Sequence, residues 1–144
     1  MTTLETILLI AQLASTLPLV GLIWTIQLVH YPLFELVGED TQVAYQKAHM
    51  SRITWIVAPL MLVELVAAGG LWLFSPTDPW AIAGAVLVAI IWVSTALIQV
   101  PCHNRLAGGF HQPSHRRLVE SNWIRTIAWS LRGGVVVVMA GIGI

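Results

Sequence analysis

Four long runs of apolar residues dominate the chain and are separated by shorter polar stretches. They cover about residues 6–30, 55–74, 79–102 and 123–144, and roughly 20 apolar residues are enough for a helix to cross a bilayer. The runs lack the alternation of apolar and polar positions that membrane β-strands require. The pattern therefore predicts an all-α integral membrane four-helix bundle of two antiparallel helical hairpins, folded as a single domain over residues 1–144.

The polar stretches before the second and fourth runs have helical character. Asp40 or Thr41 would cap a helix that continues into the second run. Gly108 and Gly109 break the chain after the third run, and Pro113 suits the first position of a new helix. The second and fourth helices are therefore expected to extend beyond the membrane at these two connections.

Composition excludes several classes of protein. Hydrophobic residues make up 57% of the chain and charged residues 10%, whereas about 25% of the residues in an ordinary soluble domain are charged. The mean hydropathy is +0.80. Seven Lys and Arg balance seven Asp and Glu, so the chain lacks the basic surface that nucleic-acid binding requires. A soluble globular domain, a disordered segment and a nucleic-acid binder are excluded, and the lipid bilayer is the expected partner.

The basic residues outside the runs predict the orientation in the membrane. Lys47 and Arg52 precede the second run, while Arg105, Arg116 and Arg117 precede the fourth. The connection between the second and third runs contains no Lys or Arg. Because basic connections face the cytoplasm, we expect a multi-pass protein of the cell (inner) membrane with its N- and C-termini outside.

Two charged residues within the runs are expected to pair. Glu64 lies nine residues after Trp55, and Arg132 lies nine residues after Trp123. Both helices start from the same side, so at about 1.5 Å per residue the two charges reach nearly the same depth. An isolated charge there is costly, which predicts a buried ion pair of Glu64 and Arg132. Such a pair either fixes helix packing or lines the path of an oligomeric transporter of ions or small molecules.

All five histidines fall in the cytoplasmic half of this arrangement. His30 and His103 end the first and third runs, and His49 precedes the second. Imidazoles from several helices at one level can bind iron, copper or zinc, or ligate haem. The candidate metal ligands are therefore His30, His49 and His103. His111 and His115 lie in a glycine-containing segment that is expected to be mobile.

Other polar side chains lie at a similar height and complete a predicted polar pocket. They are Gln27, Arg52, Gln99, Asn104, Asn122 and Arg125. Gln27 and Gln99, one turn deeper than the histidines, would orient imidazoles as second-layer partners. The pocket fits a metal or haem, or alternatively a small hydrophobic or anionic ligand. A third reading gives the histidines no common role, because histidine is also at home at membrane interfaces.

The ends of the first and third runs carry related motifs. Residues 101–106 read Pro-Cys-His-Asn-Arg-Leu, followed by Arg-Leu-Val at 117–119 and Asn-Trp-Ile-Arg-Thr at 122–126, and residues 30–32 read His-Tyr-Pro. The first run ends Gln-Leu-Val-His-Tyr-Pro-Leu at 27–33 and the third ends Gln-Val-Pro-Cys-His-Asn-Arg-Leu at 99–106, an echo that a duplicated hairpin would produce. The pattern also resembles small four-span bacterial membrane proteins grouped near the anthrone-oxygenase-like family, whose function is largely unknown. The resemblance implies a four-helix membrane bundle and an oxygenase of aromatic polyketides.

Three function classes remain open at this point. The first is a membrane oxidoreductase or oxygenase that uses iron, copper or haem in the polar pocket; the others are a transporter and a non-catalytic accessory subunit. Polar residues crowd the cytoplasmic half, with Gln12 the main polar residue towards the outer side, which favours a one-sided pocket over a through path. The small residues Ala81, Ala85 and Ala89 suit close packing within the chain or against a second copy in a homo-oligomer.

Overall fold

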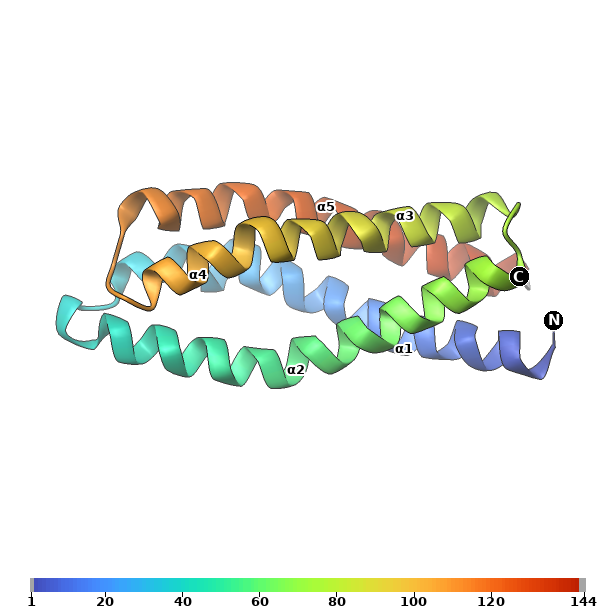
Figure 1. Cartoon of the computed structure of the whole chain (residues 1–144), viewed down its shortest axis with the longest axis horizontal. Coiled ribbons are helices and arrows are strands. Elements are labelled where there is room, and N and C mark those ends of the chain that lie inside the picture. The colour runs from blue at the N-terminus through green and yellow to red at the C-terminus, as the bar shows by residue number, and fades with distance from the viewer. Residues whose placement is uncertain (1, 143–144) are drawn as a thin grey trace.

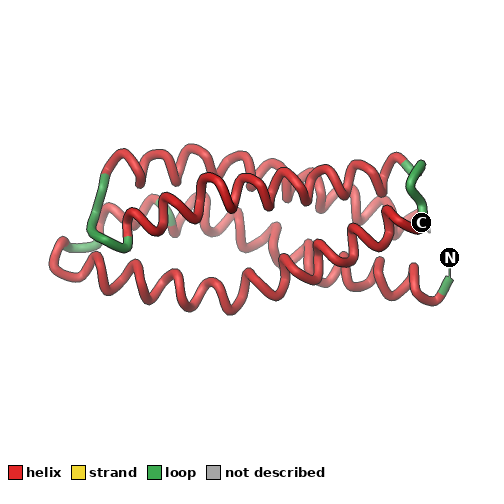
Figure 2. Tube along the Cα trace, in the orientation of Figure 1, coloured by secondary structure: helices red, strands yellow, loops and turns green. Residues whose placement is uncertain are grey.

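The computed structural model describes residues 2–142, which form long helices running side by side (Figure 1). In chain order the elements are α1 (Thr3–Thr25), the π-helical segment η1 (Ile26–His30), the 3-10 helix η2 (Pro32–Leu36), α2 (Glu39–Phe74), α3 (Pro79–Ser94), the π-helical segment η3 (Thr95–Gln99), α4 (Val100–Leu106) and α5 (Gln112–Ile142). Short loops join the helices at the two ends of the bundle (Figure 2). The predicted all-α class is confirmed.

Four helical stretches are long and apolar enough to cross a membrane: Thr3–Leu36, Glu39–Phe74, Pro79–Leu106 and Gln112–Ile142. The 36 residues of α2 span about 54 Å at 1.5 Å per residue, well beyond the hydrocarbon core of about 30 Å. The η2–α2 and α4–α5 connections lie at one end of the bundle, here called the loop end. The start of α1, the end of α5 and the α2–α3 turn lie at the opposite end, here called the terminal end (Figure 1).

The start of α2 differs from the sequence-based expectation. The cap is Gly38 rather than Asp40 or Thr41, and the helix begins at Glu39. The Thr41 hydroxyl donates to the Gly38 carbonyl at 3.1 Å and is itself inside the first turn. The expectation is wrong because η2 ends at Leu36, so that the chain turns and re-enters a helix within two residues.

The break before α5 follows the expected pattern. The backbone of Gly109 has a φ of +132°, a conformation that favours glycine because it has no Cβ. The next helix begins at Gln112, which puts Pro113 in its first turn, where a missing N–H costs nothing. Residues 107–111 are therefore a short connection rather than a helix.

Two π-helical segments occupy matching places near the loop end. In each of them the residue before a proline donates its N–H to the carbonyl five residues back. These pairs are Tyr31 to Ile26 at 3.0 Å and Val100 to Thr95, followed by Pro32 and Pro101. A proline ring collides with the carbonyl four residues before it, and the preceding turn widens by one residue to relieve the collision. The segments that precede Pro32 and Pro101 thus share a backbone geometry.

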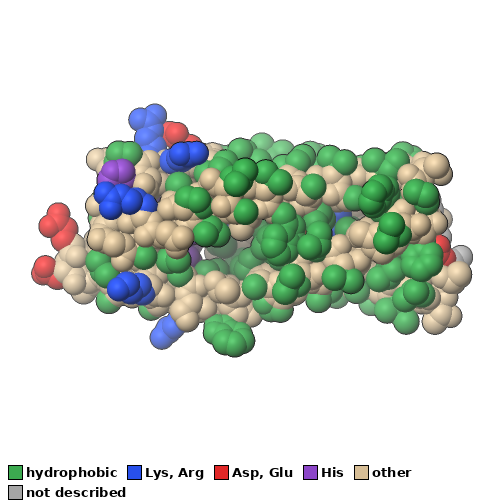
Figure 3. Space-filling view, in the orientation of Figure 1, with side chains coloured by type: hydrophobic (Ala, Val, Ile, Leu, Met, Phe, Trp, Pro, Cys, Tyr) green, Lys and Arg blue, Asp and Glu red, His purple; other side chains and the backbone are tan. Residues whose placement is uncertain are grey.

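The middle of α2 is bent (Figure 1). Pro59 lies there inside the helix and leaves the carbonyl of Trp55 without its usual helical partner. On the face of the molecule shown in Figure 3, hydrophobic side chains cover most of the surface, whereas charged side chains gather at the loop end. The same view shows the molecule hollowed between α2 and the α3–α4 stretch.

Candidate functional site

A cavity of about 270 Å³ lies beside the bend of α2, between α2 and the α3–α4 stretch. We call it the inner cavity. Most of its wall is apolar and includes Ile26, Ile53, Val57, Ala58, Met61 and Val100. The polar side chains along its wall include Tyr31, Trp92, Gln99, His103 and Arg125. An apolar chamber with a few polar groups is the usual form of a small-molecule site.

Two of the polar groups that line the inner cavity have no hydrogen-bond partner. They are Nε of Arg125 and Nε1 of Trp92, and both atoms are buried. Both groups can only donate a hydrogen bond. An unpartnered buried donor is unfavourable by about 1–3 kcal/mol, so the cavity is matched to a hydrogen-bond acceptor.

The charge of Arg125 is also uncompensated. Its side chain is only 5% exposed, yet the ion pairs among residues 2–142 are Arg116–Glu120 and Glu64–Arg132. The guanidinium carbon of Arg125 lies 5.0 Å from the ring centroid of Trp129, and such a cation–π contact contributes about 0.5–2 kcal/mol. Buried charges are normally paired. The inner cavity therefore presents a positive charge with no carboxylate partner in the described chain.

Tyr31 and His103 form a hydrogen-bonded pair on the wall of the same cavity. The Tyr31 hydroxyl lies 2.9 Å from Nε2 of His103, and Tyr31 is only 3% exposed. The other ring nitrogen of His103, Nδ1, is buried without a partner. The pair therefore retains a free hydrogen-bonding position of its own.

A second pair of imidazoles extends from this point to the surface. Nε2 of His30 lies 2.8 Å from Nδ1 of His49, and the rings of His49 and His103 are 5.5 Å apart between centroids. One nitrogen of the His30–His49 bond must accept, so at least one of these rings is neutral. His30, His49 and Arg52 line a surface groove of about 330 Å³. The structure thus brings His30, His49 and His103 into one cluster.

His30 and His49 bond to each other, and His103 bonds to Tyr31, instead of all three facing one common point. In the described part of the chain, no three side chains of His, Cys, Asp or Glu are arranged to hold one metal ion. The metal or haem site of His30, His49 and His103 stays a prediction. The observed bonds form two hydrogen-bonded pairs, His30–His49 and Tyr31–His103, rather than a set of metal ligands around one point.

The structure separates the other predicted pocket residues into different roles. Gln99 and Arg125 line the inner cavity. Asn122 donates to Gln27 at 2.9 Å, and Gln27 donates to the Val119 carbonyl at 3.1 Å. Gln27 and Asn122 therefore fasten the first helical stretch to α5 and do not contact the imidazoles through these bonds.

Asn104 and Arg52 do not line the inner cavity, contrary to the sequence-based pocket. Asn104 is exposed, because it follows His103 directly and each helical residue turns by about 100°. Arg52 is exposed as well and belongs to the surface groove with His49.

The expectation that His115 is mobile is wrong. His115 is only 5% exposed, and its Nε2 lies 2.8 Å from the Tyr31 carbonyl, to which it donates. The reason is that α5 already begins at Gln112, so His115 stands on a regular helix. His115 holds the backbone that carries Tyr31. His111, in contrast, contacts only its neighbour Ser114, through Nδ1 at 2.8 Å.

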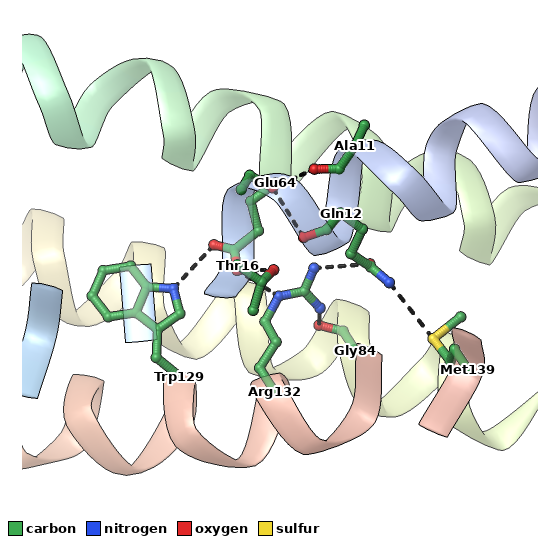
Figure 4. Close-up of polar contacts among 9 residues, drawn as sticks. Ala11, Gln12, Thr16, Glu64, Gly84, Trp129, Arg132 and Met139 are labelled. Atoms are coloured by element: carbon green, nitrogen blue, oxygen red, sulfur yellow. Dashed lines mark hydrogen bonds and ion pairs between the residues drawn. The ribbon is translucent and has the colours of Figure 1, made fainter. Parts of the chain in front are cut away.

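The predicted ion pair of Glu64 and Arg132 is present, and both side chains are fully buried. Arg132 Nε donates to Glu64 at 2.7 Å, and its two terminal nitrogens donate to the Gly84 carbonyl and to Gln12, each at 2.9 Å. Glu64 also accepts from Thr16 at 2.8 Å and from Trp129 at 3.1 Å. Figure 4 shows these contacts converging from separate helices. Every charged oxygen and nitrogen of the pair therefore has a hydrogen-bond partner. We call Glu64 and Arg132, together with these partners, the clamp.

Sequence reasoning missed four residues near the site. Tyr31 was visible only as part of the His-Tyr-Pro motif, and Trp92 as one aromatic residue among several in the runs. Gln42 and Gln46 are buried on α2, and none of their four side-chain polar atoms has a partner. Their spacing of four residues places them on one face of α2, but a polar extension of a helix gives no sign of such burial.

No protein-family model, curated protein or solved structure matches this chain. The resemblance to the anthrone-oxygenase-like family stays a prediction. Function is therefore argued from the geometry of the site.

Proposed function

We propose that the protein is a multi-pass protein of the cell membrane that binds a small, largely apolar molecule bearing an anionic or strongly polarised oxygen. The ligand occupies the inner cavity and places this oxygen against Arg125. One observation carries the proposal: Arg125 and Trp92 line the same cavity, and each has a buried, donor-only nitrogen without a partner, Nε and Nε1 respectively.

Size and wall chemistry narrow the ligand class. A cavity of about 270 Å³ lies near the lower end of the common range for ligand sites, about 300–1,000 Å³, which fits a molecule of one or two rings. Met61, Val57 and Ile53 of α2 would contact its hydrocarbon part. Such a molecule dissolves in the bilayer, and the hollow beside α2 faces the apolar side of the bundle (Figure 3).

Competing functions have less support from the geometry. The transporter hypothesis needs free polar groups along a path, but Glu64 and Arg132 are engaged on all sides. A metal-dependent oxidoreductase needs ligands that face a common point, and the bonds of His49 and His103 are directed otherwise.

The proposed orientation places the loop end in the cytoplasm. Lys47, Arg105 and Arg117 belong to the extensions at that end, and the α2–α3 turn at the terminal end has no Lys or Arg. In a Cys102→Ser background, a cysteine introduced at Thr77 should react with an impermeant thiol reagent on intact cells, whereas one at Arg116 should react only after lysis. The reverse labelling would contradict this orientation.

The binding proposal is tested with 2-naphthoate, a two-ring carboxylate, and the full chain in nanodiscs of uncharged lipid. Equilibrium dialysis should show saturable binding above that of empty nanodiscs. Arg125→Gln should weaken binding about 10- to 100-fold, because a hydrogen bond to a charged group contributes about 1.5–3 kcal/mol. Trp92→Phe should weaken it less, because it removes a neutral donor.

Arg117→Gln provides the matched control. Arg117 lies on the same helix but is exposed, so its loss should leave the dissociation constant unchanged. 2-Methylnaphthalene has the rings without the carboxylate. It should therefore bind the wild type and Arg125→Gln with the same affinity. Equal 2-naphthoate binding by wild type and Arg125→Gln, or none above empty nanodiscs, would overturn the proposal.

A further inference from the structure

We infer that the inner cavity also catalyses proton transfer: His103 removes a proton from the carbon next to a ketone carbonyl, while Arg125 holds the oxygen of the resulting enolate. This inference rests on the proposed function, because the substrate must first occupy the inner cavity. The substrate class is a small apolar ketone with an acidic C–H beside its carbonyl.

The base is defined by the bond between Tyr31 and His103. We assign the hydrogen of neutral His103 to Nε2, which then donates to the Tyr31 oxygen 2.9 Å away and leaves the lone pair of Nδ1 free. Nδ1 is buried and has no partner, while the side chain lines the cavity. A fixed imidazole with one free nitrogen is the usual form of a general base. Tyr31 fixes the ring and stabilises the imidazolium that forms.

The negative charge of the enolate has a matching site. Arg125 and Trp92 both line the cavity, and each has a buried N–H group without a partner that is already desolvated. Donors that are fixed before reaction and point at developing charge lower a barrier more than mobile water does. Because Arg125 lacks a carboxylate partner within residues 2–142, its charge remains available to the enolate.

The step is balanced without an oxidant or reductant. The C–H bond breaks, its proton binds Nδ1 of His103, and its electron pair forms the carbon–carbon double bond of the enolate. The π pair of the carbonyl moves onto oxygen beside Arg125. Return of a proton to carbon regenerates the ketone, so the observable reaction is exchange of that hydrogen with solvent.

A route for the proton leads from the cavity to the surface. The His49 ring lies 5.5 Å from that of His103 between centroids, and His49 bonds to His30 at 2.8 Å. His30 and His49 line the surface groove at the other side of the cluster. Neighbouring imidazoles can pass protons because each ring both accepts and donates. A water molecule between the rings of His103 and His49 would complete this route from the buried base to solvent.

The test follows deuterium incorporation into 2-tetralone, a two-ring enolisable ketone, in deuterated buffer by mass spectrometry. The full chain in nanodiscs should accelerate incorporation over empty nanodiscs, and 2-naphthoate should inhibit it by competition. His103→Gln should lower the protein-dependent rate about 100-fold or more, the usual contribution of a general base. Its affinity for 2-naphthoate should stay within about threefold, because the carboxylate binds Arg125.

Controls separate this inference from the proposed function. His111→Gln changes a histidine that lines neither the inner cavity nor the surface groove, so it should leave exchange unchanged. If 2-naphthoate binds but exchange is not accelerated, or if His103→Gln exchanges like wild type, proton transfer is wrong and the ligand site stands. If 2-naphthoate does not bind at all, the proposed function fails. If His103→Gln no longer binds 2-naphthoate, the Tyr31→Phe variant tests the inference instead. The inference then requires that Tyr31→Phe still binds 2-naphthoate and loses most of the deuterium exchange.

Discussion

Two buried arginines on one face of α5 have opposite surroundings. Arg125 and Arg132 are seven residues apart, about two turns, with Trp129 between them. Arg132 is fully enclosed by Glu64, Gln12 and the Gly84 carbonyl. Arg125 contacts the face of the Trp129 ring, has no carboxylate partner in the described chain, and leaves Nε unbonded beside a cavity.

The difference separates a structural from a functional use of the same residue type. A buried charge whose partners are all in the chain fixes how helices pack, and nothing remains for a ligand to do. A buried charge without partners is unfavourable in the free protein and becomes favourable when a ligand supplies the missing acceptor. We therefore assign a structural role to Arg132 in the terminal-end half of the bundle, and a ligand-binding role to Arg125 in the loop-end half.

The largest expected effect comes from breaking the clamp. Arg132→Met or Glu64→Leu alone leaves an unpaired buried charge and should lower the free energy of unfolding by about 3–5 kcal/mol. The double variant should lose less than the sum of the two. Reversible unfolding in mixed detergent micelles measures all three. Additive losses would show that the two side chains do not stabilise each other.

Crowding the clamp should have the next largest effect. A Cβ at Gly84 would lie 3.0 Å from a terminal nitrogen of Arg132, which the Gly84 carbonyl itself holds. We therefore expect Gly84→Ala to destabilise the protein by about 1–3 kcal/mol, as overpacking does. At Gly134 a Cβ meets nothing within 4 Å, so Gly134→Ala, measured in the same micelles, should be neutral or stabilising. Equal effects at both glycines would contradict this account of the clamp.

Two buried glutamines extend the comparison. Gln12 accepts from Arg132 and donates to Met139, so Gln12→Leu should lower the free energy of unfolding by about 1–3 kcal/mol. Gln46 is equally buried but has no partner, so Gln46→Leu should leave stability unchanged or raise it. A loss at Gln46 as large as that at Gln12 would show that Gln46 has a bonded partner, such as bound water.

Only a small change in stability is expected at Arg125. Arg125→Met removes a buried charge that has no carboxylate partner, together with its contacts to Trp129 and Tyr31, so the free energy of unfolding should shift by no more than about 1 kcal/mol. The same variant should abolish the rise in melting temperature that 2-naphthoate gives the wild type through binding the folded state. Destabilisation as severe as that of Arg132→Met would mean that Arg125 is a second clamp.

Much of the fold could be predicted from the sequence because membrane helices are encoded by length and polarity. The apolar runs predict four helical stretches, and counting residues from Trp55 and Trp123 predicts the meeting of Glu64 and Arg132. Depth is a simple function of position along a helix. The gathering of His30, His49 and His103 follows from the same kind of counting.

Rotation about the helix axis was harder to predict. Asn104 has the right depth but the wrong face, and the π-helical turns before Pro32 and Pro101 shift the register by one residue. The role of Trp92 depends on which helix lies opposite it across the inner cavity, which no local pattern specifies. His115 was misjudged because the nearby glycines suggested mobility, whereas α5 begins early enough to include it.

The most direct measurement is a structure of the protein with 6-bromo-2-naphthoate, located by the anomalous scattering of bromine. The account predicts one bromine site inside the inner cavity, near Met61 and Val57, with the carboxylate against Arg125 Nε and Trp92 Nε1. Bromine found only at lipid-facing surfaces, or a carboxylate bound away from Arg125, would contradict it.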